Sequence, residues 1–304
     1  MVSCMKLDLF KKALEEKGIE YKTLEPMKNH TSFKIGGEAD IFVKVKDISS
    51  LKETLKSAKE NEVPTFILGK GSNLLVSDDG SEGAVISLLG LDEISLEDDI
   101  INCAAGVSLS SLCRFVRDNS LSGLEFAYGI PGSVGGAVYM NAGAYGGEMA
   151  DVLISVTCMD EEGNIKEISL EDMELGYRNS VFMKNGMIVL SAKLRLKSGK
   201  QEDITAAMED YMSRRLSKQP LEYPSAGSTF KRPEGYFAGA LIEENGLKGL
   251  TIGGAMVSEK HAGFVINYEN ASCKDVKELI NRISERVFEN NGVKLQPEVI
   301  FVGR

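Results

Sequence analysis

The chain has 304 residues, is 43% hydrophobic and 26% charged, and carries a formal net charge of −10 at pH 7. Its length exceeds the ~250 residues at which single hydrophobic cores stop growing, so we expect a globular protein with more than one domain. The acidic balance argues against a nucleic-acid partner, and neither a secretion signal nor an apolar stretch of about 20 residues is visible. This pattern predicts a cytoplasmic protein without membrane insertion.

Hydrophobic periodicity, taken in chain order, predicts a succession of helices and strands. A capping box at Ser50 and Glu53 would open the second helix, and Pro64 would end it before a strand, which gives a β-α-β unit. The helices are expected over residues 5–17, 50–62, 108–119, 201–217, 237–245 and 273–290. The strands are expected over residues 40–45, 65–69, 74–77, 83–88, 93–96, 100–106, 152–159, 164–168, 186–196, 261–267 and 298–303.

The most unusual segment is the glycine-rich stretch 123–148, GLEFAYGIPGSVGGAVYMNAGAYGGE, in which eight of 26 residues are Gly. Glycine allows positive φ angles and lets main-chain N–H groups face a ligand such as a nucleotide diphosphate without an intervening Cβ. A second loop, ILGKGSNLLVSD at 67–78, follows the β-α-β unit at the strand end where α/β sheets bind ligands. Two such loops predict one long, phosphate-bearing cofactor.

Neither loop matches the usual nucleotide-binding fingerprints. Gly69 and Gly71 form G-x-G, but Leu74 stands where the dinucleotide pattern has its third glycine, and no Walker sequence occurs. A Rossmann or P-loop fold is therefore disfavoured. Glycine turns without a ligand remain the alternative, above all for the loop at 67–78.

Cysteine and histidine usage disfavours metal and triad chemistry. The five cysteines are scattered without a C-x-x-C pair, which predicts reduced thiols rather than disulfides or a zinc site. The two histidines, His30 and His261, lie far apart, so we expect neither a metal centre nor a Ser-His-Asp triad. The chemistry should therefore come from an organic cofactor.

Three polar residues stand in unusual settings. Arg178 in LGYRNSVF lies between an apolar helix end and further apolar residues. Ser228 follows an Ala-Gly pair in YPSAGSTFKRP, and Glu298 opens an apolar strand after a proline in LQPEVIFVG. Taken singly, each also fits a plain interpretation: an arginine that caps a helix, a loop serine, and a glutamate at a sheet edge.

Six motifs, in order, carry a resemblance to a known family: NHTSFKIGG, GKGSNLL, GIPGSVGGAVYMNAGAYGGE, YRNSVF, SAGSTFKRP and LQPEV. From about Asn29 to its end, the chain resembles the UDP-N-acetylenolpyruvoylglucosamine reductases, the MurB family. The resemblance implies an α+β fold, namely a two-subdomain FAD-binding fold of the vanillyl-alcohol-oxidase type plus a C-terminal α+β substrate-binding domain. We expect the FAD-binding region at 1–200, split near residue 80, and the substrate-binding domain at 201–304.

The length between two motifs indicates the subtype. About 50 residues separate Arg178 from Ser228, which is too few for the insertion that carries a substrate-clamping tyrosine in one subtype. The chain is therefore similar to the shorter, type II members, and contacts that depend on that tyrosine cannot be transferred to it.

The resemblance implies an NADPH-dependent, FAD-containing oxidoreductase that reduces UDP-N-acetylglucosamine enolpyruvate to UDP-N-acetylmuramate. This reaction belongs to peptidoglycan synthesis, and so to cell-wall biogenesis, cell shape and cell division. FAD would be bound non-covalently. We expect a monomer that binds this small UDP-sugar and no metal.

The resemblance also implies roles for individual residues. Arg178 would stabilise the negative charge that forms beside the substrate carboxylate, and Ser228 would deliver a proton to carbon. Glu298 would polarise the group that Arg178 contacts, but only if it is protonated or shares a proton, because an ionised carboxylate would repel the charge. The implied FAD contacts lie in the two glycine loops: Gly69, Lys70, Gly71, Ser72, Asn73, Gly132, Ser133, Gly135, Gly136, Asn141, Ala142 and Gly143. The candidates for the UDP diphosphate are Lys231, Arg232 and Lys248.

Two other functions remain open. An alcohol oxidase of the same fold would also bind FAD, but it would oxidise its substrate and pass electrons to oxygen. A UDP-sugar-binding regulator that has lost the cofactor would be colourless. The joint presence of Arg178, Ser228 and Glu298 argues against the regulator, because binding alone requires no proton donor.

Overall fold

The computed structural model describes residues 2–304, which form two compact units. Unit 1 contains the residues up to Lys22 together with Phe42–Lys70 and Gly83–Arg214, and unit 2 contains Thr23–Ile41, Gly71–Glu82 and Arg215–Arg304. These units do not coincide with the regions expected from the sequence, since unit 2 also includes two N-terminal segments. The functional division into an FAD-binding and a substrate-binding region stays a prediction.

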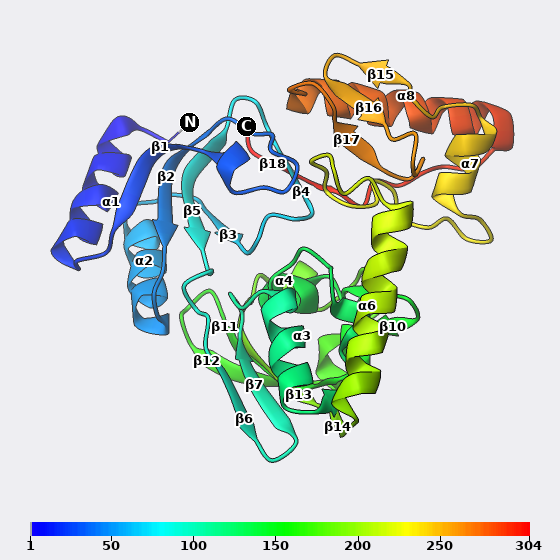
Figure 1. The fold of residues 1–304 in the computed structure, drawn as a ribbon. Coiled ribbons are helices and arrows are strands. Elements are labelled where there is room, and N and C mark those ends of the chain that lie inside the picture. The colour runs from blue at the N-terminus through cyan, green and yellow to red at the C-terminus, as the bar shows by residue number, and fades with distance from the viewer. Residues whose placement is uncertain (1) are drawn as a thin grey trace. The chain divides into compact units, whose positions relative to one another are not determined.

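The N-terminal part of the chain contains two helices and a four-stranded sheet. The elements are α1 (Cys4–Glu16), α2 (Ile48–Glu60), β1 (Tyr21–Pro26), β2 (Glu38–Lys44), β3 (Thr65–Leu68) and β5 (Ser81–Ser87). The strand order is β1-β2-β5-β3, and β3 runs parallel to β5. Helices α1 and α2 lie side by side (Figure 1) and bury Phe10, Leu14 and Leu51 completely. The expected β-α-β unit therefore delivers the first glycine loop directly after β3.

The start of α2 differs from the expectation. The helix begins at Ile48 rather than Ser50, because the carboxylate of Asp47 accepts a hydrogen bond of 2.6 Å from the main-chain N–H of Ser50. The hydroxyl of Ser50 in turn accepts the N–H of Asp47 at 3.2 Å. The predicted capping box of Ser50 and Glu53 was therefore wrong by one turn, since Asp47 is an equally good cap.

The second half of unit 1 is a five-stranded antiparallel sheet with helices packed on it. Its strands are β6 (Ile94–Glu97), β7 (Ile100–Ala104), β11 (Leu153–Met159), β12 (Ile165–Ser169) and β13 (Ile188–Arg195), in the order β12-β11-β13-β7-β6. The helices are α3 (Leu109–Asp118), α4 (Val134–Tyr139), α5 (Phe182–Asn185) and α6 (Gln201–Lys218). Two short antiparallel strand pairs complete it: β8 (Leu121–Ser122) with β14 (Lys197–Ser198), and the hairpin of β9 (Gly143–Ala144) and β10 (Gly147–Glu148).

One apolar core joins these elements. It includes Leu112 of α3, Val138 of α4, Val156 of β11 and Met208 of α6, all 2% exposed or less. Helix α4 lies inside the long glycine stretch, where no helix was predicted. Burial of its two valines against the sheet compensates for its two glycines, which are poor helix formers.

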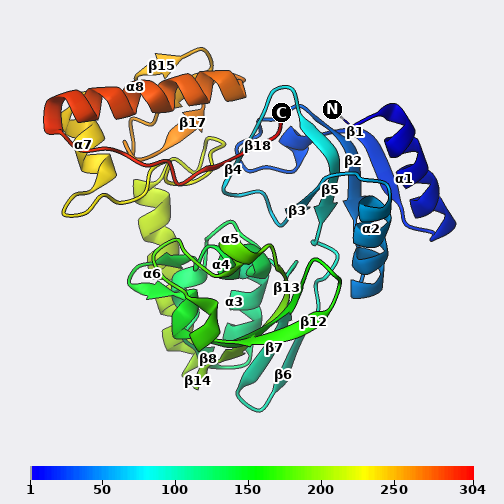
Figure 2. The same cartoon turned by 180° about the vertical axis from the view of Figure 1, so that it is seen from behind.

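Unit 2 contains the C-terminal helices and a small sheet. The elements are α7 (Ala238–Glu244), α8 (Cys273–Asn291), β15 (Thr251–Ile252), β16 (Ala255–Val257) and β17 (Val265–Asn267). The sheet packs on α8 (Figure 2), which buries Leu279 and Ile283 completely. The carboxylate of Asp78 accepts the main-chain N–H groups of Cys273 at 2.8 Å and Lys274 at 3.1 Å, and so caps α8.

The last strand lies far from its partner in the sequence. Strand β18 (Ile300–Val302) pairs in parallel with β4 (Leu74–Val76), which follows the first glycine loop. Apart from α2, the predicted helices agree with the structure to within one residue at each end, whereas the strands predicted at 261–267 and 298–303 are shorter. Among residues 2–304, no helix is long and apolar enough to cross a membrane.

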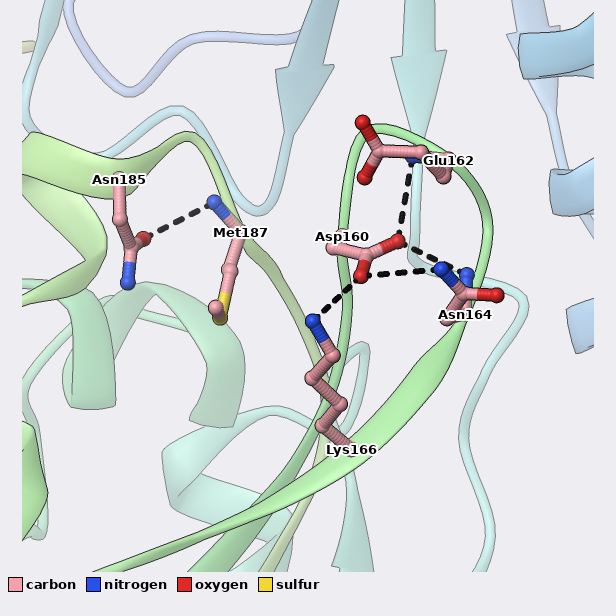
Figure 3. Close-up of polar contacts among 6 residues, drawn as sticks. All are labelled: Asp160, Glu162, Asn164, Lys166, Asn185 and Met187. Carbon is pink, nitrogen blue, oxygen red and sulfur yellow. Dashed lines mark hydrogen bonds and ion pairs between the residues drawn. The ribbon is translucent and has the colours of Figure 1, made fainter.

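The turn between β11 and β12 is built around one carboxylate (Figure 3). Asp160 accepts the main-chain N–H groups of Glu162 at 3.1 Å and Asn164 at 2.9 Å, and its other oxygen lies 2.7 Å from the ammonium of Lys166. The hydrogen bond from Lys166 is the largest cause that holds the pKa of Asp160 well below its usual range.

Candidate active site

The two glycine loops meet at Ser133 in unit 1. Gly69 follows β3, and Ser133 immediately precedes α4. An ideal Cβ placed on Gly69 would lie 2.5 Å from the hydroxyl oxygen of Ser133, and one on Gly136 would lie 3.5 Å from it. Two glycines that are 67 positions apart in the sequence therefore border one hydroxyl group.

The hydroxyl of Ser133 is an orphaned polar group. The residue is 1% exposed, and its Oγ has no hydrogen-bond partner among residues 2–304. A buried hydroxyl without a partner typically costs ~1–3 kcal/mol, which an oxygen of a ligand could offset. An unsatisfied hydroxyl beside two residues without side chains fits a phosphate-bearing cofactor.

The long glycine loop is held in place by its own main chain. The N–H of Leu109 donates to the carbonyl of Gly132 at 3.0 Å, and the N–H of Gly135 donates to Ala105 at 2.9 Å. A Cβ on Gly135 would lie 2.9 Å from the Cβ of Ala105. Gly135 is therefore required by packing, and the loop is preorganised beside Ser133.

Two other glycines also have neighbours within the protein. Gly71 has a φ of +61°, and a Cβ there would lie 2.1 Å from the carbonyl oxygen of His30. The NHTSFKIGG segment therefore packs directly against the first glycine loop. A Cβ on Gly143 would lie 2.8 Å from the carbonyl oxygen of Gly147 in the β9-β10 hairpin. The proposed contacts of both glycines with FAD stay predictions, as do those of Lys70, Ser72 and Ala142.

Arg178 lies at the tip of a tight turn rather than directly after a regular helix. The N–H groups of Gly176 and Asn179 each donate to the carbonyl of the other at 3.1 Å, with Tyr177 and Arg178 between them. Arg178 has a φ of +52°, a conformation that glycine adopts far more readily. Such strain costs ~1–3 kcal/mol and clusters at functional sites, so it supports a functional interpretation of Arg178.

The segments that carry Ser228 and Glu298 lie together in unit 2. The N–H of Glu298 donates to the carbonyl of Thr229 at 2.8 Å, next to Ser228. The side chain of Asn73 donates to the main-chain carbonyl of Glu298 at 3.2 Å, and the main-chain carbonyl of Asn73 accepts the N–H of Ile300 at 2.9 Å. Two predicted catalytic segments and the first glycine loop are thus joined by hydrogen bonds. Arg178 belongs to unit 1, and its meeting with these groups stays a prediction.

The side chain of Ser228 is exposed on a segment that is itself fixed. Gly227 before it has a φ of +78°, and Thr229 after it is 3% exposed. The N–H of Thr229 donates to Gly263 at 2.8 Å, and its hydroxyl accepts the N–H of Val265 at 2.9 Å. A rigid support therefore presents the serine hydroxyl.

Two of the three predicted diphosphate contacts share a hollow of about 330 Å³ in unit 2. Lys231 and Arg232 line it together with Lys294, which the sequence analysis missed. The guanidinium of Arg232 lies 4.0 Å from the ring centre of Phe237. Lys248 does not line this hollow, and its ammonium lies 2.6 Å from the carboxylate of Glu243. Three cations and one carboxylate, that of Glu234, line the hollow, and this excess of positive charge suits a diphosphate. Lys248, in contrast, already has an anionic partner.

Two family models match the chain. The model described as FAD binding domain matches residues 39–169, and the model described as UDP-N-acetylenolpyruvoylglucosamine reductase, C-terminal domain, matches residues 219–302. Both glycine loops lie within the first match, and Ser228 and Glu298 lie within the second. The expected α+β fold, an FAD-binding region followed by a C-terminal domain, is confirmed.

Known proteins are similar to this chain over nearly its whole length. The UDP-N-acetylenolpyruvoylglucosamine reductase of Clostridium tetani is 49% identical over 297 residues, which make up 97% of each chain. The reductase of the same name from Clostridioides difficile is 51% identical over 285 residues, 93% of this chain and 94% of the relative. The crystal structure of UDP-N-acetylenolpyruvylglucosamine reductase (MurB) from Thermus caldophilus is 37% identical, with a TM-score of 0.80, and covers 93% of this chain and 98% of that chain.

Proposed function

Because the chain belongs to the family of UDP-N-acetylenolpyruvoylglucosamine reductases, we propose that it reduces UDP-N-acetylglucosamine enolpyruvate to UDP-N-acetylmuramate with NADPH and FAD. The product is a peptidoglycan precursor. The observation that carries the proposal is the hydrogen-bonded junction of Asn73, Glu298 and the segment of Ser228, because it joins a cofactor loop to a proton donor. We expect the enzyme to be a cytoplasmic monomer.

The glycine loops hold the cofactor without a covalent bond. Bound FAD, once reduced by NADPH, supplies hydride to the enolpyruvyl double bond. The orphaned hydroxyl of Ser133, which Gly69 and Gly136 border, would donate to a diphosphate oxygen of the bound cofactor. The same donor would remain unsatisfied without the cofactor, so binding removes a cost that the free protein carries.

Arg178 stabilises the charge that develops when hydride reaches the substrate. Addition of hydride leaves a carbanion next to the substrate carboxylate, which behaves as an enolate. The guanidinium presents two parallel N–H donors that suit a carboxylate or an enolate oxygen, and one preorganised donor of this kind typically contributes ~3–4 kcal/mol. The strained turn fixes the main chain from which this side chain extends.

Ser228 completes the reaction by protonating the carbanion. A carbanion is a strong base, so even a weakly acidic hydroxyl can serve as donor when its position is fixed, and such donation contributes ~10²- to 10⁴-fold in rate. Glu298 acts on the same group from the adjacent segment, whose main chain is hydrogen-bonded to Thr229. Lys231 and Arg232, with Lys294, bind the substrate diphosphate in their hollow.

The visible spectrum of the purified protein tests the proposal. We expect a yellow protein that bleaches with NADPH and regains its colour, without oxygen, when UDP-N-acetylglucosamine enolpyruvate is added. Recovery only in air would indicate an oxidase instead. A protein that stays colourless after FAD is added would indicate a UDP-sugar-binding regulator.

A further inference from the structure

Two buried side chains connect the long glycine loop to the turn that carries Arg178. We infer that Asn141 and Ser180 are positioning residues, which hold the Arg178 turn to the cofactor loop so that the guanidinium meets the substrate in one orientation. The inference rests on the proposed function, because it assigns a role toward Arg178 in that reaction.

The side chain of Asn141 has a partner at each end. Its Nδ2 donates to the carbonyl of Gly176 at 3.1 Å, and its Oδ1 accepts the N–H of Ala150 at 3.0 Å. The residue is 1% exposed and has a φ of +42°, which Asn tolerates better than most residues. The expected contact of Asn141 with the cofactor stays a prediction, and within the protein its amide holds the first residue of the turn.

Ser180 holds the other end of the same turn. It is completely buried, and its hydroxyl donates to the carbonyl of Tyr139, the last residue of α4, at 2.7 Å. Residues 176 and 180 are thus both fixed to the segment 139–141, one by an amide and one by a hydroxyl. Only the two residues at the tip, Tyr177 and Arg178, extend beyond the reciprocal hydrogen bonds of Gly176 and Asn179.

Both anchors are needed because the turn is strained. Arg178 occupies a left-handed conformation, and a short segment in such a conformation persists only when its surroundings determine it. Loss of either anchor would let the turn relax toward a less strained backbone. A displacement of about 1 Å in a positioned group can cost ~10²-fold in rate.

A positioning role and a merely structural role of Asn141 and Ser180 predict different kinetic effects when these residues are substituted. Loss of one buried hydrogen bond always costs stability, typically ~1 kcal/mol, and would lower the melting temperature in either case. If the anchors act through Arg178, they slow the step in which Arg178 stabilises charge. The reduction of FAD by NADPH involves no enolate and should be spared.

The test uses the full-length, FAD-loaded enzyme and stopped-flow measurement of both half-reactions. Ser180→Ala removes one anchor, and Asn141→Asp removes the other donor but keeps the oxygen that accepts Ala150. We expect reoxidation by the enolpyruvyl substrate to slow about 10- to 100-fold in each variant, with flavin reduction within about twofold of the unaltered enzyme. Ser155→Ala is the matched control, because Ser155 is also buried and donates one hydrogen bond, to Glu167 at 2.6 Å, away from the turn.

A double substitution supplies the decisive comparison. In an Arg178→Ala background, Ser180→Ala and Asn141→Asp should slow reoxidation no further, because the group they position is gone. Effects that multiply with those of Arg178→Ala, or that fall equally on both half-reactions, would overturn the inference. Failure of the proposed function would be seen in a different measurement: the enolpyruvyl substrate would not reoxidise even the unaltered enzyme. If Ser180→Ala does not fold, Asn141→Asp decides the question alone.

Discussion

The hydroxyl oxygen of Ser133 lies 2.5 Å from the point where a Cβ on Gly69 would stand, and the Cβ of Ser133 lies 3.7 Å from that point. The hydroxyl alone therefore makes alanine too large at position 69. Since the φ of Gly69 lies outside the left-handed region, alanine there meets a steric obstacle but no backbone strain. Removing the Ser133 hydroxyl therefore separates two effects of alanine at position 69, namely its effect on packing and its effect on cofactor binding.

Gly69→Ala should destabilise the cofactor-free protein by about 1–3 kcal/mol, because the new methyl group overpacks against Ser133. The double variant Gly69→Ala/Ser133→Ala should regain that stability. It should bind FAD at least about tenfold more weakly, because the hydroxyl donor of Ser133 is lost and the methyl group at position 69 takes up space beside the cofactor. Thermal unfolding and flavin-fluorescence titration measure the two effects. Full recovery of FAD affinity in the double variant would show that this corner does not contact the cofactor.

Gly136→Ala provides a contrasting case on helix α4. A Cβ there meets only the Ser133 hydroxyl, at 3.5 Å, and alanine favours the helix by ~0.5–1 kcal/mol over glycine. We expect a cofactor-free protein that is at least as stable as the original, with weaker FAD binding in an equilibrium titration. An unchanged dissociation constant would remove Gly136 from the cofactor site.

Ser228→Ala should separate the two halves of the catalytic cycle. Flavin reduction by NADPH should stay nearly intact, while reoxidation by the enolpyruvyl substrate should slow ~10²- to 10⁴-fold, because the proton donor is missing. Stopped-flow absorbance resolves both steps. Ser284→Ala on helix α8, where the hydroxyl only donates to the carbonyl of Ile280 at 2.8 Å, is the control. Equal slowing of both steps by Ser228→Ala would contradict the assignment.

Asp160→Asn should lower the melting temperature near neutral pH, since the turn of Figure 3 depends on an ionised carboxylate. The folded state lowers the pKa of Asp160 below its ordinary value of 3.8, so its contribution is complete above that value and is lost as pH falls through the folded pKa. The difference between the two proteins should therefore shrink below about pH 4. Melting curves between pH 3 and 7 measure it, with Glu162→Gln, which keeps the main-chain donor, as control. A constant difference would mean that the charge of Asp160 plays no part.

Regular local patterns predicted most of the fold. Helices such as α3 and α8 have a clear apolar stripe, and their ends agree with the structure because Ser108 and Ser272 are good caps. Helix α4 escaped prediction because a run rich in glycine and alanine has no periodicity to detect. Strand β1 escaped because three of its six residues, Lys22, Thr23 and Glu25, are polar and do not alternate regularly with apolar ones.

The candidate site required more than local patterns. The glycine loops predicted a phosphate-bearing cofactor, but the meeting of Gly69 with Ser133 depends on contacts between distant segments. The pairing of Thr229 with Glu298 likewise joins residues 69 positions apart, and only the family resemblance made their association foreseeable. Ser180 could have been noticed as a polar residue beside the apolar residues of YRNSVF.

Because β18 pairs with β4, residues 300–302 stabilise the end of the first glycine loop. Arg304 is itself held in place, because its N–H donates to the carbonyl of Gly80 at 3.0 Å and its guanidinium pairs with Asp40. A purification tag joined directly to Arg304 would accordingly pull on the strand that steadies Asn73. The loop that precedes β4 can therefore acquire its lasting shape only when residues 300–302 are available to pair with residues 74–76.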